Sequence, residues 1–373
     1  MGGLDLLLLC GADLLLMGEL EAGGVQVTGE LGAFLLKCCT CLGHRLRHRK
    51  VALSGAGIQL GLERGDLRIA RGKLFAELLL LIGGILLGKQ QMMFPRTYGL
   101  VSSETRTLPK NTAALEALCQ RYPGKVNVML VPAASAIYPE NVPAGAPLLD
   151  EDSYLDSLSD AVQAAEGRFV DVRQTLTAHK DEYIYYRTDH HWTSTGAYYA
   201  YKQLCDALSL TPFDPSAHTV LTADGFYGTH YSKARTPDAE PDTITYYDLP
   251  NALTIYSVSG PGQPADGETT GLYDTAKLDV YDKYAMFLHG NNGLSRIKGD
   301  GTGRILVIKD SYANCFVPYL TANYADIDVV DFRNYNYGLD KLIADNDYDQ
   351  LLVLYSFDSF KSDPYLYRAG VAG

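Results

Sequence analysis

Strand-like and helix-like segments alternate in the C-terminal part of the chain, and this alternation restricts the possible fold more than any other feature of the sequence. Residues 304–310 (RILVIKD), 326–332 (DIDVVDF) and 349–356 (DQLLVLYS) are short apolar runs typical of buried strands. Residues 311–325 and 338–346, which lie between these runs, show the apolar spacing of helices. Strands joined by helices form a parallel sheet with helices on its faces. The sequence therefore predicts an α/β fold.

The same alternation extends back to about residue 111. The expected helices cover 111–122, 153–167 and 193–210, and the expected strands cover 126–132, 168–173 and 284–288. Asn111 is a suitable N-cap for the first of these helices, and Thr193 or Ser194 for the third. Residues 211–283 are rich in Thr, Tyr, Asp, Gly and Pro. We therefore expect a mostly β insertion there, acting as a lid or a substrate-facing flap.

The composition changes sharply near residue 97. The first 97 residues contain no Tyr, Asn or Trp and carry a net charge of +3, whereas the rest contain all 27 Tyr and carry −15. We expect the Leu- and Gly-rich segment 1–93 to be disordered or non-native, and residues 94–367 to form the domain. Neither the run 4–17, which contains two Asp residues, nor the ten-residue run 78–87 makes a convincing export signal or a membrane span of ~20 residues.

Charge and cysteine content exclude some classes of function. The net charge of −12, with no basic cluster among aromatic residues, argues against nucleic-acid binding. The group CCTC (38–41), followed by His44 and His48, does not have the spacing of a structural zinc site. The three cysteines after residue 97 are scattered and predict no disulfide framework. No cofactor-binding motif is expected.

Ser311 follows directly after the predicted strand 304–310, where a helix is expected to start. Ligands bind at the carboxyl ends of parallel strands, and backbone N–H groups at a helix start favour negative charge. Ser311 is therefore a candidate nucleophile, although the G-x-S-x-G pattern is absent. The alternative is that Asp310 and Ser311 form an ordinary N-cap pair.

The stretch TDHHW (188–192) supplies a carboxylate and two imidazoles. In an extended backbone, Asp189 and His191 would share one side while His190 would point away. An Asp–His pair is two thirds of a catalytic triad, which Ser311 would complete. The alternatives are a structural hydrogen bond or a metal site that includes His190, for which no second ligand cluster lies nearby in the sequence. Trp192 is expected to anchor the packing or to line the pocket.

A third candidate element is FLHGNNG (287–293), which follows the predicted strand 284–288. An acyl-transfer serine needs hydrogen-bond donors aimed at the developing oxyanion. The Gly290 N–H and the Asn291 side-chain amide are suitable donors. The alternative is a plain Gly/Asn turn.

Together these residues resemble the bacterial DHHW protein family. YYRTDHHWTSTGAYYAY, KYAMFLHGNN and ILVIKDSYANCFVPYL look like its blocks in the same order, and the resemblance covers about residues 94–367. The family is in turn similar to the SGNH-hydrolase-like proteins that O-acetylate alginate and related exopolysaccharides, in which a D-x-H pair precedes a D-S block. Lys309 departs from that signature, which has Gly there, so the turn before Ser311 is expected to differ.

The resemblance implies a serine acyltransferase or esterase that moves acetyl groups on cell-surface polysaccharide through an acyl-enzyme. Ser311 would be the nucleophile, with His191 as the base that Asp189 orients. Gly290 and Asn291 would stabilise the oxyanion. The resemblance further implies an extracytoplasmic location and a membrane-bound partner that donates the acyl group. The alternative is a non-catalytic protein of the cell envelope that binds glycan or acts as a scaffold. Apart from the resemblance, Trp192 is a candidate for the pocket wall, and the insertion offers Tyr227, Tyr231, Tyr246 and Tyr247 to stack on sugar rings, the alternative being packing within β hairpins.

Overall fold

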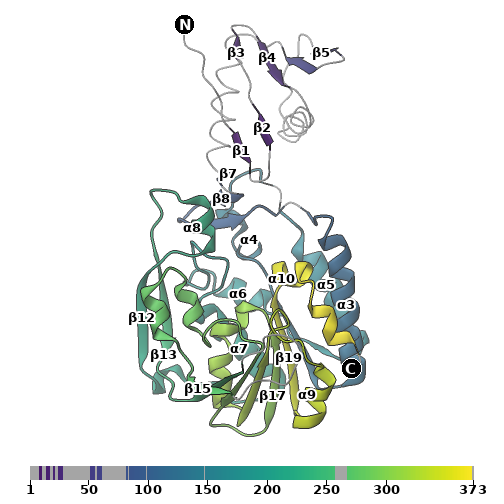
Figure 1. Cartoon of the computed structure of the whole chain (residues 1–373), viewed down its shortest axis with the longest axis vertical. Coiled ribbons are helices and arrows are strands. Elements are labelled where there is room, and N and C mark those ends of the chain that lie inside the picture. The colour runs from purple at the N-terminus through teal and green to yellow at the C-terminus, as the bar shows by residue number, and fades with distance from the viewer. Residues whose placement is uncertain are drawn as a thin grey trace. The chain divides into compact units, whose positions relative to one another are not determined.

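The computed structural model describes residues 84–97, 99–146, 148–256 and 267–371, together with the backbone of short strands before residue 83. It divides into two compact units, Met1–Leu86 with Pro143–Gly145 and Leu87–Val142 with Ala146–Gly373 (Figure 1). The strands before residue 83 are β1 (Leu8–Cys10), β2 (Leu14–Leu16), β3 (Leu20–Glu21), β4 (Gly24–Val27), β5 (Val51–Ser54), β6 (Gly57–Leu60) and β7 (Leu81–Ile82). The prediction that residues 1–93 are disordered or non-native falls mainly outside the described residues.

The larger unit contains the expected mixture of helices and strands. The α-helices are α3 (Glu104–Arg121), α4 (Ala134–Ile137), α5 (Glu151–Ala164), α6 (Arg173–Ala178), α7 (Ser194–Leu208), α8 (Thr229–Ala234), α9 (Leu339–Asn346) and α10 (Phe357–Ser362). The strands from residue 85 onward are β8 (Ile85–Leu87), β9 (Met93–Pro95), β10 (Val126–Val131), β11 (Arg168–Phe169), β12 (Val220–Phe226), β13 (Asp242–Tyr247), β14 (Ala252–Tyr256), β15 (Glu268–Gly271), β16 (Leu294–Lys298), β17 (Arg304–Lys309), β18 (Asp326–Val330) and β19 (Gln350–Ser356). Among the described residues, no helix combines the length and the apolar character needed to cross a membrane.

The main sheet has eight strands in the order β11-β10-β19-β17-β18-β16-β14-β15. The first five strands run parallel, with Val307 of β17 paired to Leu352 of β19 and to Val329 of β18. This confirms the predicted α/β fold. The last three strands are antiparallel to their neighbours. The excursion 211–283 therefore supplies β14 and β15 to the edge of the main sheet, while β12 and β13 pair separately.

Runs of Val, Ile and Leu explain why the central strands form the core. All six residues of β10 are buried, as are all residues of β17 after Arg304. Side chains of α3, α5, α9 and α10 pack against one face of these strands, with Leu115, Leu158 and Phe360 almost fully buried there. Figure 1 shows these helices on one side of the sheet and α6 and α7 on the other. The sheet is thus covered on both faces, as parallel strands require.

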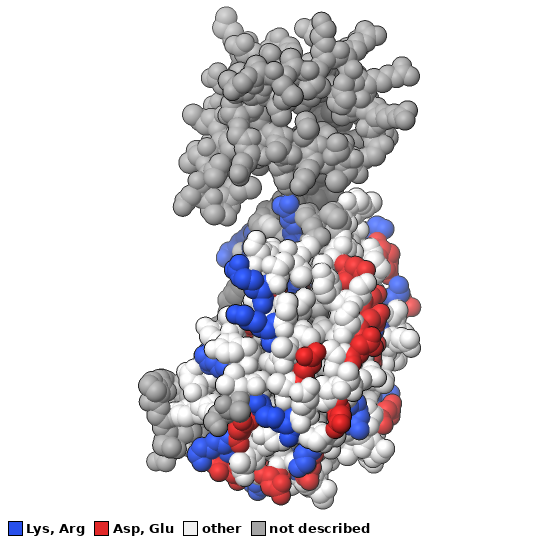
Figure 2. Space-filling view, turned by 90° about the vertical axis from the view of Figure 1, so that its right-hand side faces the viewer, with Lys and Arg blue, Asp and Glu red and all other residues white. Residues whose placement is uncertain are grey.

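Helix α5 shows how the covering helices separate apolar and charged faces. Leu155, Leu158 and Val162 are buried, whereas Asp152 and Asp156 are exposed one helical turn apart. Figure 2 shows the face of the molecule on the α3 and α5 side, where Asp and Glu side chains gather toward one edge and are mixed with Lys and Arg side chains in the lower part.

Two predicted segments have a different local structure. Residues 311–325 form two 3-10 helices, η5 (Ser311–Cys315) and η6 (Val317–Ala322), instead of one α-helix. Pro318 has no N–H to donate to a residue one turn back, so an α-helix cannot continue through it. The predicted strand 284–288 is wrong: residues Lys283–Met286 form the 3-10 helix η4, and Leu288 and His289 have positive φ. The remaining 3-10 helices are η1 (Pro139–Asn141), η2 (Pro215–Ala217), η3 (Thr275–Asp279) and η7 (Leu366–Gly370).

The predicted N-caps had different outcomes. Asn111 is not an N-cap, because α3 begins earlier, at Glu104, whose carboxylate accepts the Val101 N–H. The buried Asn111 side chain instead donates to the carbonyls of Phe360 and Asp363. Thr193 is confirmed as the N-cap of α7, since its hydroxyl accepts the N–H of the residue three positions later at 3.3 Å.

Candidate active site

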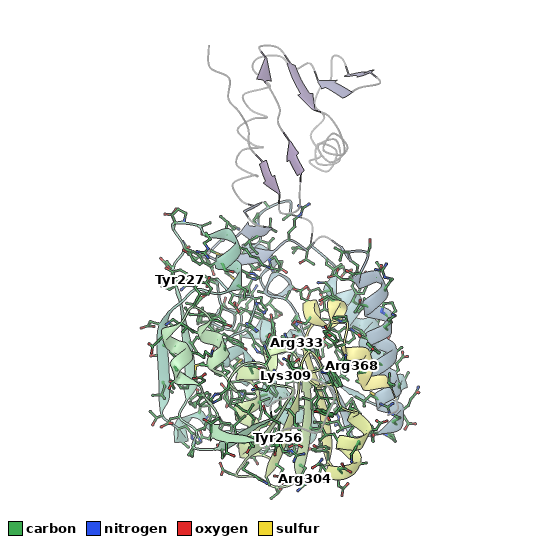
Figure 3. All side chains as sticks on the ribbon, in the orientation of Figure 1. Tyr227, Tyr256, Arg304, Lys309, Arg333 and Arg368 are labelled. Carbon is green, nitrogen blue, oxygen red and sulfur yellow. The ribbon has the colours of Figure 1, made fainter. Side chains whose placement is uncertain are left out.

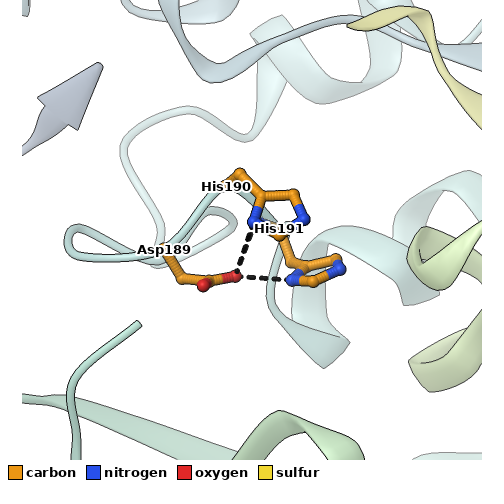
Figure 4. A group of neighbouring side chains, drawn as sticks. All are labelled: Asp189, His190 and His191. Atoms are coloured by element: carbon orange, nitrogen blue, oxygen red, sulfur yellow. Dashed lines mark hydrogen bonds and ion pairs between the residues drawn. The ribbon is translucent and has the colours of Figure 1, made fainter. Parts of the chain in front are cut away.

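Three side chains from distant parts of the sequence form one hydrogen-bonded line. The Ser311 Oγ lies 2.8 Å from the Nε2 of His191, and the Nδ1 of His191 lies 2.5 Å from the Oδ1 of Asp189. Asp189 and His191 are almost fully buried, whereas Ser311 is partly exposed. Figure 4 shows the contact between Asp189 and His191. A neutral imidazole in this line can accept the proton of the serine hydroxyl while the carboxylate fixes its orientation.

The Asp–His pair is made by a turn and not by an extended strand. Residues 187–191 form a bend, and the Asp189 Oδ1 also accepts the backbone N–H of His191 at 3.0 Å. A side chain that bonds the backbone two residues onward is the typical Asx turn. The expectation that strand alternation brings Asp189 and His191 together was therefore wrong in its geometry, although the two side chains do meet.

The end of β17 holds Ser311 in place through its neighbour Asp310. One carboxylate oxygen of Asp310 accepts the Tyr312 N–H at 2.9 Å and caps η5. The other accepts the N–H and the hydroxyl of Ser356, at the end of the adjacent strand β19, at 2.9 and 2.8 Å. The N-cap alternative is therefore correct for Asp310. Because Asp310 alone caps η5, the Ser311 hydroxyl can bond His191.

Residues of the insertion 211–283 hold the TDHHW turn in place through hydrogen bonds. The Thr229 N–H, at the start of α8, donates to the Asp189 Oδ2 at 2.7 Å. The buried Asp242 of β13 accepts the N–H of Arg187 at 3.0 Å and the N–H of Thr188 at 2.8 Å. This part of the chain therefore positions the acid of the triad. Thr229 and Asp242 were not predicted from the sequence, because neither belongs to a recognisable motif. Each bonds a segment that lies far away in the sequence.

Gly228 allows Asp189 to approach the start of α8. A Cβ added at Gly228 would lie 2.2 Å from the Asp189 Cβ and 2.4 Å from its Oδ2. Its φ of −87° is open to other residues, so the requirement for glycine is one of space. We expect Gly228→Ala to lower the free energy of unfolding by about 1–3 kcal/mol through overpacking, measured by urea denaturation. Gly99→Ala is the matched control, because a Cβ there meets nothing within 4 Å; an equal effect of both changes would contradict the role of Gly228.

Tyr284 supports the imidazole from one side. Its ring stacks on the His191 ring with 3.8 Å between centroids and 13° between planes. Its hydroxyl donates to the Ser311 carbonyl at 3.1 Å and also lies 3.3 Å from the Cys315 Sγ. Tyr284 thus connects the His191 ring to the backbone of Ser311. It was missed because the segment 284–288 was predicted to be a strand of the sheet.

The electrostatic surroundings keep the base neutral at neutral pH. Burial and the adjacent His190 lower the pKa of His191 to about 4, although the Asp189 carboxylate acts in the opposite direction. Burial alone would raise the pKa of Asp189, but the two histidines beside it hold that pKa well below its usual range. An anionic Asp189 next to a neutral His191 is the charge state that a general base requires.

His190 lies beside the triad with its side chain 39% exposed. Its Nδ1 lies 2.6 Å from the Thr229 hydroxyl and 3.6 Å from the Asp189 Oδ1. Burial opposes its protonation, but the carboxylates of Asp189 and Asp310 outweigh that effect and raise the pKa of His190. Its ring therefore caps the triad on the solvent side, consistent with a supporting role.

Asp189, His190 and His191 could also be considered as metal ligands, since one ligand atom from each lies within 4.8 Å of the others. The Asp189 Oδ1 and His191 Nδ1, however, are 2.5 Å apart, a hydrogen-bond distance. Two ligands of one tetrahedral zinc ion, each ~2.0 Å from it, lie more than 3 Å apart. A metal would have to separate this pair and turn the His191 ring away from Ser311, so these residues do not fit a metal centre as arranged.

The predicted oxyanion donors occupy the loop after η4. The Gly290 N–H donates to the Phe287 carbonyl at 3.0 Å, so its use as an oxyanion donor would require that bond to open. The Asn291 side chain is close to the Ser311 segment, because its Oδ1 accepts from Lys309 at 2.8 Å and from Asn314 at 3.2 Å. The roles of Gly290 and Asn291 stay predictions.

Trp192, predicted to anchor the packing or to line the pocket, and Tyr227, predicted to stack on a sugar, lie in different surroundings. Trp192 is fully buried, and its indole N–H donates to the Tyr312 carbonyl at 2.9 Å, which supports the packing interpretation. The Tyr227 ring packs on Tyr231, 4.4 Å between centroids. Figure 3 shows Tyr227 toward the edge of the molecule near α8, apart from Lys309. Contact of Tyr227 with a glycan stays a prediction.

This α/β fold, with a buried Asp–His pair facing a serine at a strand end, has the architecture of an SGNH-hydrolase-like protein. Residues 163–330 match the family model described as DHHW protein, which confirms the predicted relationship to that family. Residues 85–225 match a second model, described as the SGNH hydrolase-like domain of the acetyltransferase AlgX. No curated protein sequence matches this chain significantly.

Solved structures support the same fold. A DHHW family protein from Eubacterium siraeum is 23% identical, with a TM-score of 0.63, and the match covers 77% of this chain and 95% of that one. PatB1 from Bacillus cereus is 18% identical, with a TM-score of 0.60, and the match covers 76% and 98%. A second PatB1 structure, which carries a sulfonyl adduct, has a TM-score of 0.59 at 16% identity and covers 76% and 97%.

Proposed function

We propose that this protein is a serine-dependent acyltransferase or esterase that moves acetyl groups on cell-surface polysaccharide through an acyl-enzyme. The observation that carries the proposal is the placement of the Ser311 Oγ 2.8 Å from the Nε2 of a neutral His191 whose Nδ1 is held by Asp189. Nucleophilic catalysis requires a serine in hydrogen-bond contact with a base that a third group orients.

In the first half of the reaction, the Ser311 Oγ attacks the carbonyl carbon of an acetyl ester and its proton passes to the Nε2 of His191. Asp189 stabilises the imidazolium that forms. The Ser311 N–H, with Gly290 and Asn291, would stabilise the oxyanion of the tetrahedral intermediate, at ~3–4 kcal/mol for each good donor. When the intermediate collapses, the leaving alcohol takes the proton from His191, and the acetyl group remains on Ser311.

In the second half, an acceptor hydroxyl attacks the acetyl-serine and gives its proton to His191. The new ester forms, and the proton returns to the Ser311 oxygen. A sugar hydroxyl as acceptor gives transfer, and water gives hydrolysis. Each half exchanges one acyl–oxygen bond for another without a change of oxidation state, so the chain's own residues suffice for the proton transfers.

The match of residues 85–225 to a model named for an acetyltransferase supports acetyl groups as the moiety that is moved. The carbohydrate acceptor follows from the resemblance of the sequence blocks to proteins that O-acetylate exopolysaccharides. We further propose that the protein works outside the cytoplasm, where such polysaccharides are modified, and receives acetyl groups from a membrane-bound partner. Trp192 would shape the site from behind Tyr312, and Tyr227 would contact the sugar chain.

The test is the capture of the acyl-enzyme. With an activated ester such as p-nitrophenyl acetate, we expect a burst of one equivalent of nitrophenol and, by intact-mass spectrometry, one acetyl group that peptide mapping assigns to Ser311. A folded protein that releases no burst and binds a glycan would instead identify the non-catalytic alternative.

The same experiment has an expected pH dependence. His191 acts as a base only when it is deprotonated, and its pKa is lowered to about 4. The acylation rate should therefore rise with pH through about pH 4 and stay level through neutral pH, whereas an ordinary histidine would titrate near ~6.5. A half-maximal rate near the ordinary value would contradict the electrostatic account of the site.

A further inference from the structure

Lys309 is a buried cation two residues before Ser311, at the end of β17. It is 1% exposed, and Figure 3 places it at the centre of the larger unit, near Arg333. Its ammonium group contacts three acceptors: the Oδ1 of Asn291 at 2.8 Å, the Oδ1 of Asn314 at 2.7 Å and the Oδ2 of Asp331 at 3.3 Å. Two of these partners are neutral amides, so the Lys309 ammonium group does more than form an ion pair with Asp331.

The conformation of Lys309 shows why it can replace a glycine in the SGNH signature. Lys309 is not among the described residues with positive φ, and it pairs within the ladder between β17 and β19. The backbone at this position therefore does not need glycine, and the turn before Ser311 is formed by the cap of Asp310. The side chain of Lys309 is the new feature that the substitution introduces.

The ammonium group fixes which way the two amides face. An ammonium group can only donate, so both Asn291 and Asn314 must present their oxygen atoms to it. The Asn314 Nδ2 then donates to the same Asn291 oxygen at 3.2 Å. With two donors on its Oδ1, the Asn291 side chain must turn its NH₂ group away from Lys309. Among the described residues this NH₂ group has no hydrogen-bond partner, and Asn291 is exposed to solvent.

Burial opposes the charge on Lys309 and neighbouring carboxylates favour it. Burial and the nearby Arg333 lower the pKa of Lys309, whereas the carboxylates of Asp331 and Asp310 act in the opposite direction. Asp331 is itself buried and also pairs with Arg333 at 2.5 Å. Although burial disfavours its ionised form, Lys309 and Arg333 hold the pKa of Asp331 below its ordinary value. The Asp331 carboxylate therefore lies between Lys309 and Arg333, and the Lys309 ammonium group lies directly behind the two amide oxygens.

We propose that Lys309 is a positioning residue that locks Asn291 with its amide N–H groups free to bind the oxyanion formed at Ser311. The inference rests on the proposed function. A cation at the amide oxygen polarises the amide and strengthens its N–H groups as donors. The donor is thus set before substrate binds, which is the condition under which an oxyanion donor is most effective.

The test measures acylation by p-nitrophenyl acetate in the full chain. We expect Lys309→Met to lower the acylation kcat by roughly 10- to 100-fold with KM within about twofold, because only the transition state is affected. Asn291→Ala should lower kcat by about 10²-fold or more. The double variant should be no slower than Asn291→Ala, since Lys309 acts through Asn291.

Two further variants make the outcome unambiguous. Lys361→Met is the matched control: Lys361 is also buried and paired, with Glu104 at 3.3 Å and with Asp358, so loss of a buried cation alone is tested there. Asn291→Asp keeps an oxygen facing Lys309 and removes the free N–H groups, so it should lose kcat as Asn291→Ala does. This variant tests whether the free N–H groups of Asn291 are needed, a condition of the inference, even if Lys309→Met fails to fold.

Three results would overturn the inference. They are additive losses in the double variant, an equal loss of kcat in Lys361→Met, and an unchanged kcat in Asn291→Asp. In each of these cases the wild-type protein still acylates Ser311, and the proposed function stands. Absence of acylation in the wild-type protein would instead overturn the proposed function, and this inference with it.

Discussion

Replacement of Ser311 by alanine is expected to lower acetyl transfer by roughly 10⁴-fold or more, because the acyl-enzyme of the proposed mechanism forms on the Ser311 Oγ. The Ser311 Oγ makes one hydrogen bond within the described residues, to the Nε2 of His191. The change should therefore leave the stability of the fold nearly intact. The measurement combines the p-nitrophenyl acetate burst with labelling by a fluorophosphonate or sulfonyl fluoride, followed by mass spectrometry.

A neighbouring serine provides the control for this experiment. Ser194 is buried at the start of α7, and its Oγ has no hydrogen-bond partner among the described residues. Ser194→Ala should keep both the burst and the labelling. If Ser311→Ala retained the burst, or if the label appeared on another residue, the assignment of the nucleophile would be wrong.

Asp189→Asn is expected to have the second large effect, a loss of about 10³- to 10⁴-fold in kcat. An asparagine NH₂ group facing the His191 Nδ1 would make that nitrogen an acceptor and put the proton on the Nε2. The Nε2 could then no longer accept the proton of Ser311. Because the substrate does not touch Asp189, KM should change little, and steady-state kinetics separates the two parameters.

The same substitution should also destabilise the protein. The Oδ1 of Asp189 accepts from His191, and its Oδ2 accepts the Thr229 N–H. Asparagine has one acceptor oxygen, so either orientation sets its NH₂ group against a backbone N–H. We expect a loss of about 1–3 kcal/mol in the free energy of unfolding. A folded Asp189→Asn variant with unchanged kcat would show that the carboxylate does not act in catalysis.

The sequence could predict the reactive groups but not the contacts that hold them. Ser311 was found because a strand end is a local signal, and Asp189 with His191 because they are adjacent in one short motif. Thr229, Asp242 and Tyr284 were missed because their roles depend on where the chain returns after long connections. Thr229 lies on α8 and Asp242 on the separate β12–β13 pair, and no local pattern encodes their approach to residues 187–189.

Two incorrect predictions from the sequence have the same physical cause. Asn111 was predicted as a cap and lies in the helix interior, and the strand predicted at 284–288 is a 3-10 helix followed by left-handed residues. In both cases tertiary hydrogen bonds outweigh the local preference: Asn111 bonds two carbonyls near α10, and the Tyr284 hydroxyl bonds the Ser311 carbonyl. The local structure of a residue is therefore hardest to predict from the sequence when its side chain bonds a residue far away in the chain.

The hydrogen bonds that Asp242 accepts from the backbone N–H groups of Arg187 and Thr188 have a consequence for protein engineering. The residues that hold Asp189 and its turn lie in the segment 211–283, whereas Ser311 follows a strand of the central sheet. The two halves of the triad therefore depend on separately encoded parts of the chain. Specificity could be changed by exchanging residues 211–283 for the same region of a relative. Such an exchange would remove the contacts that hold Asp189 unless Gly228, Thr229 and Asp242 were kept at the same places.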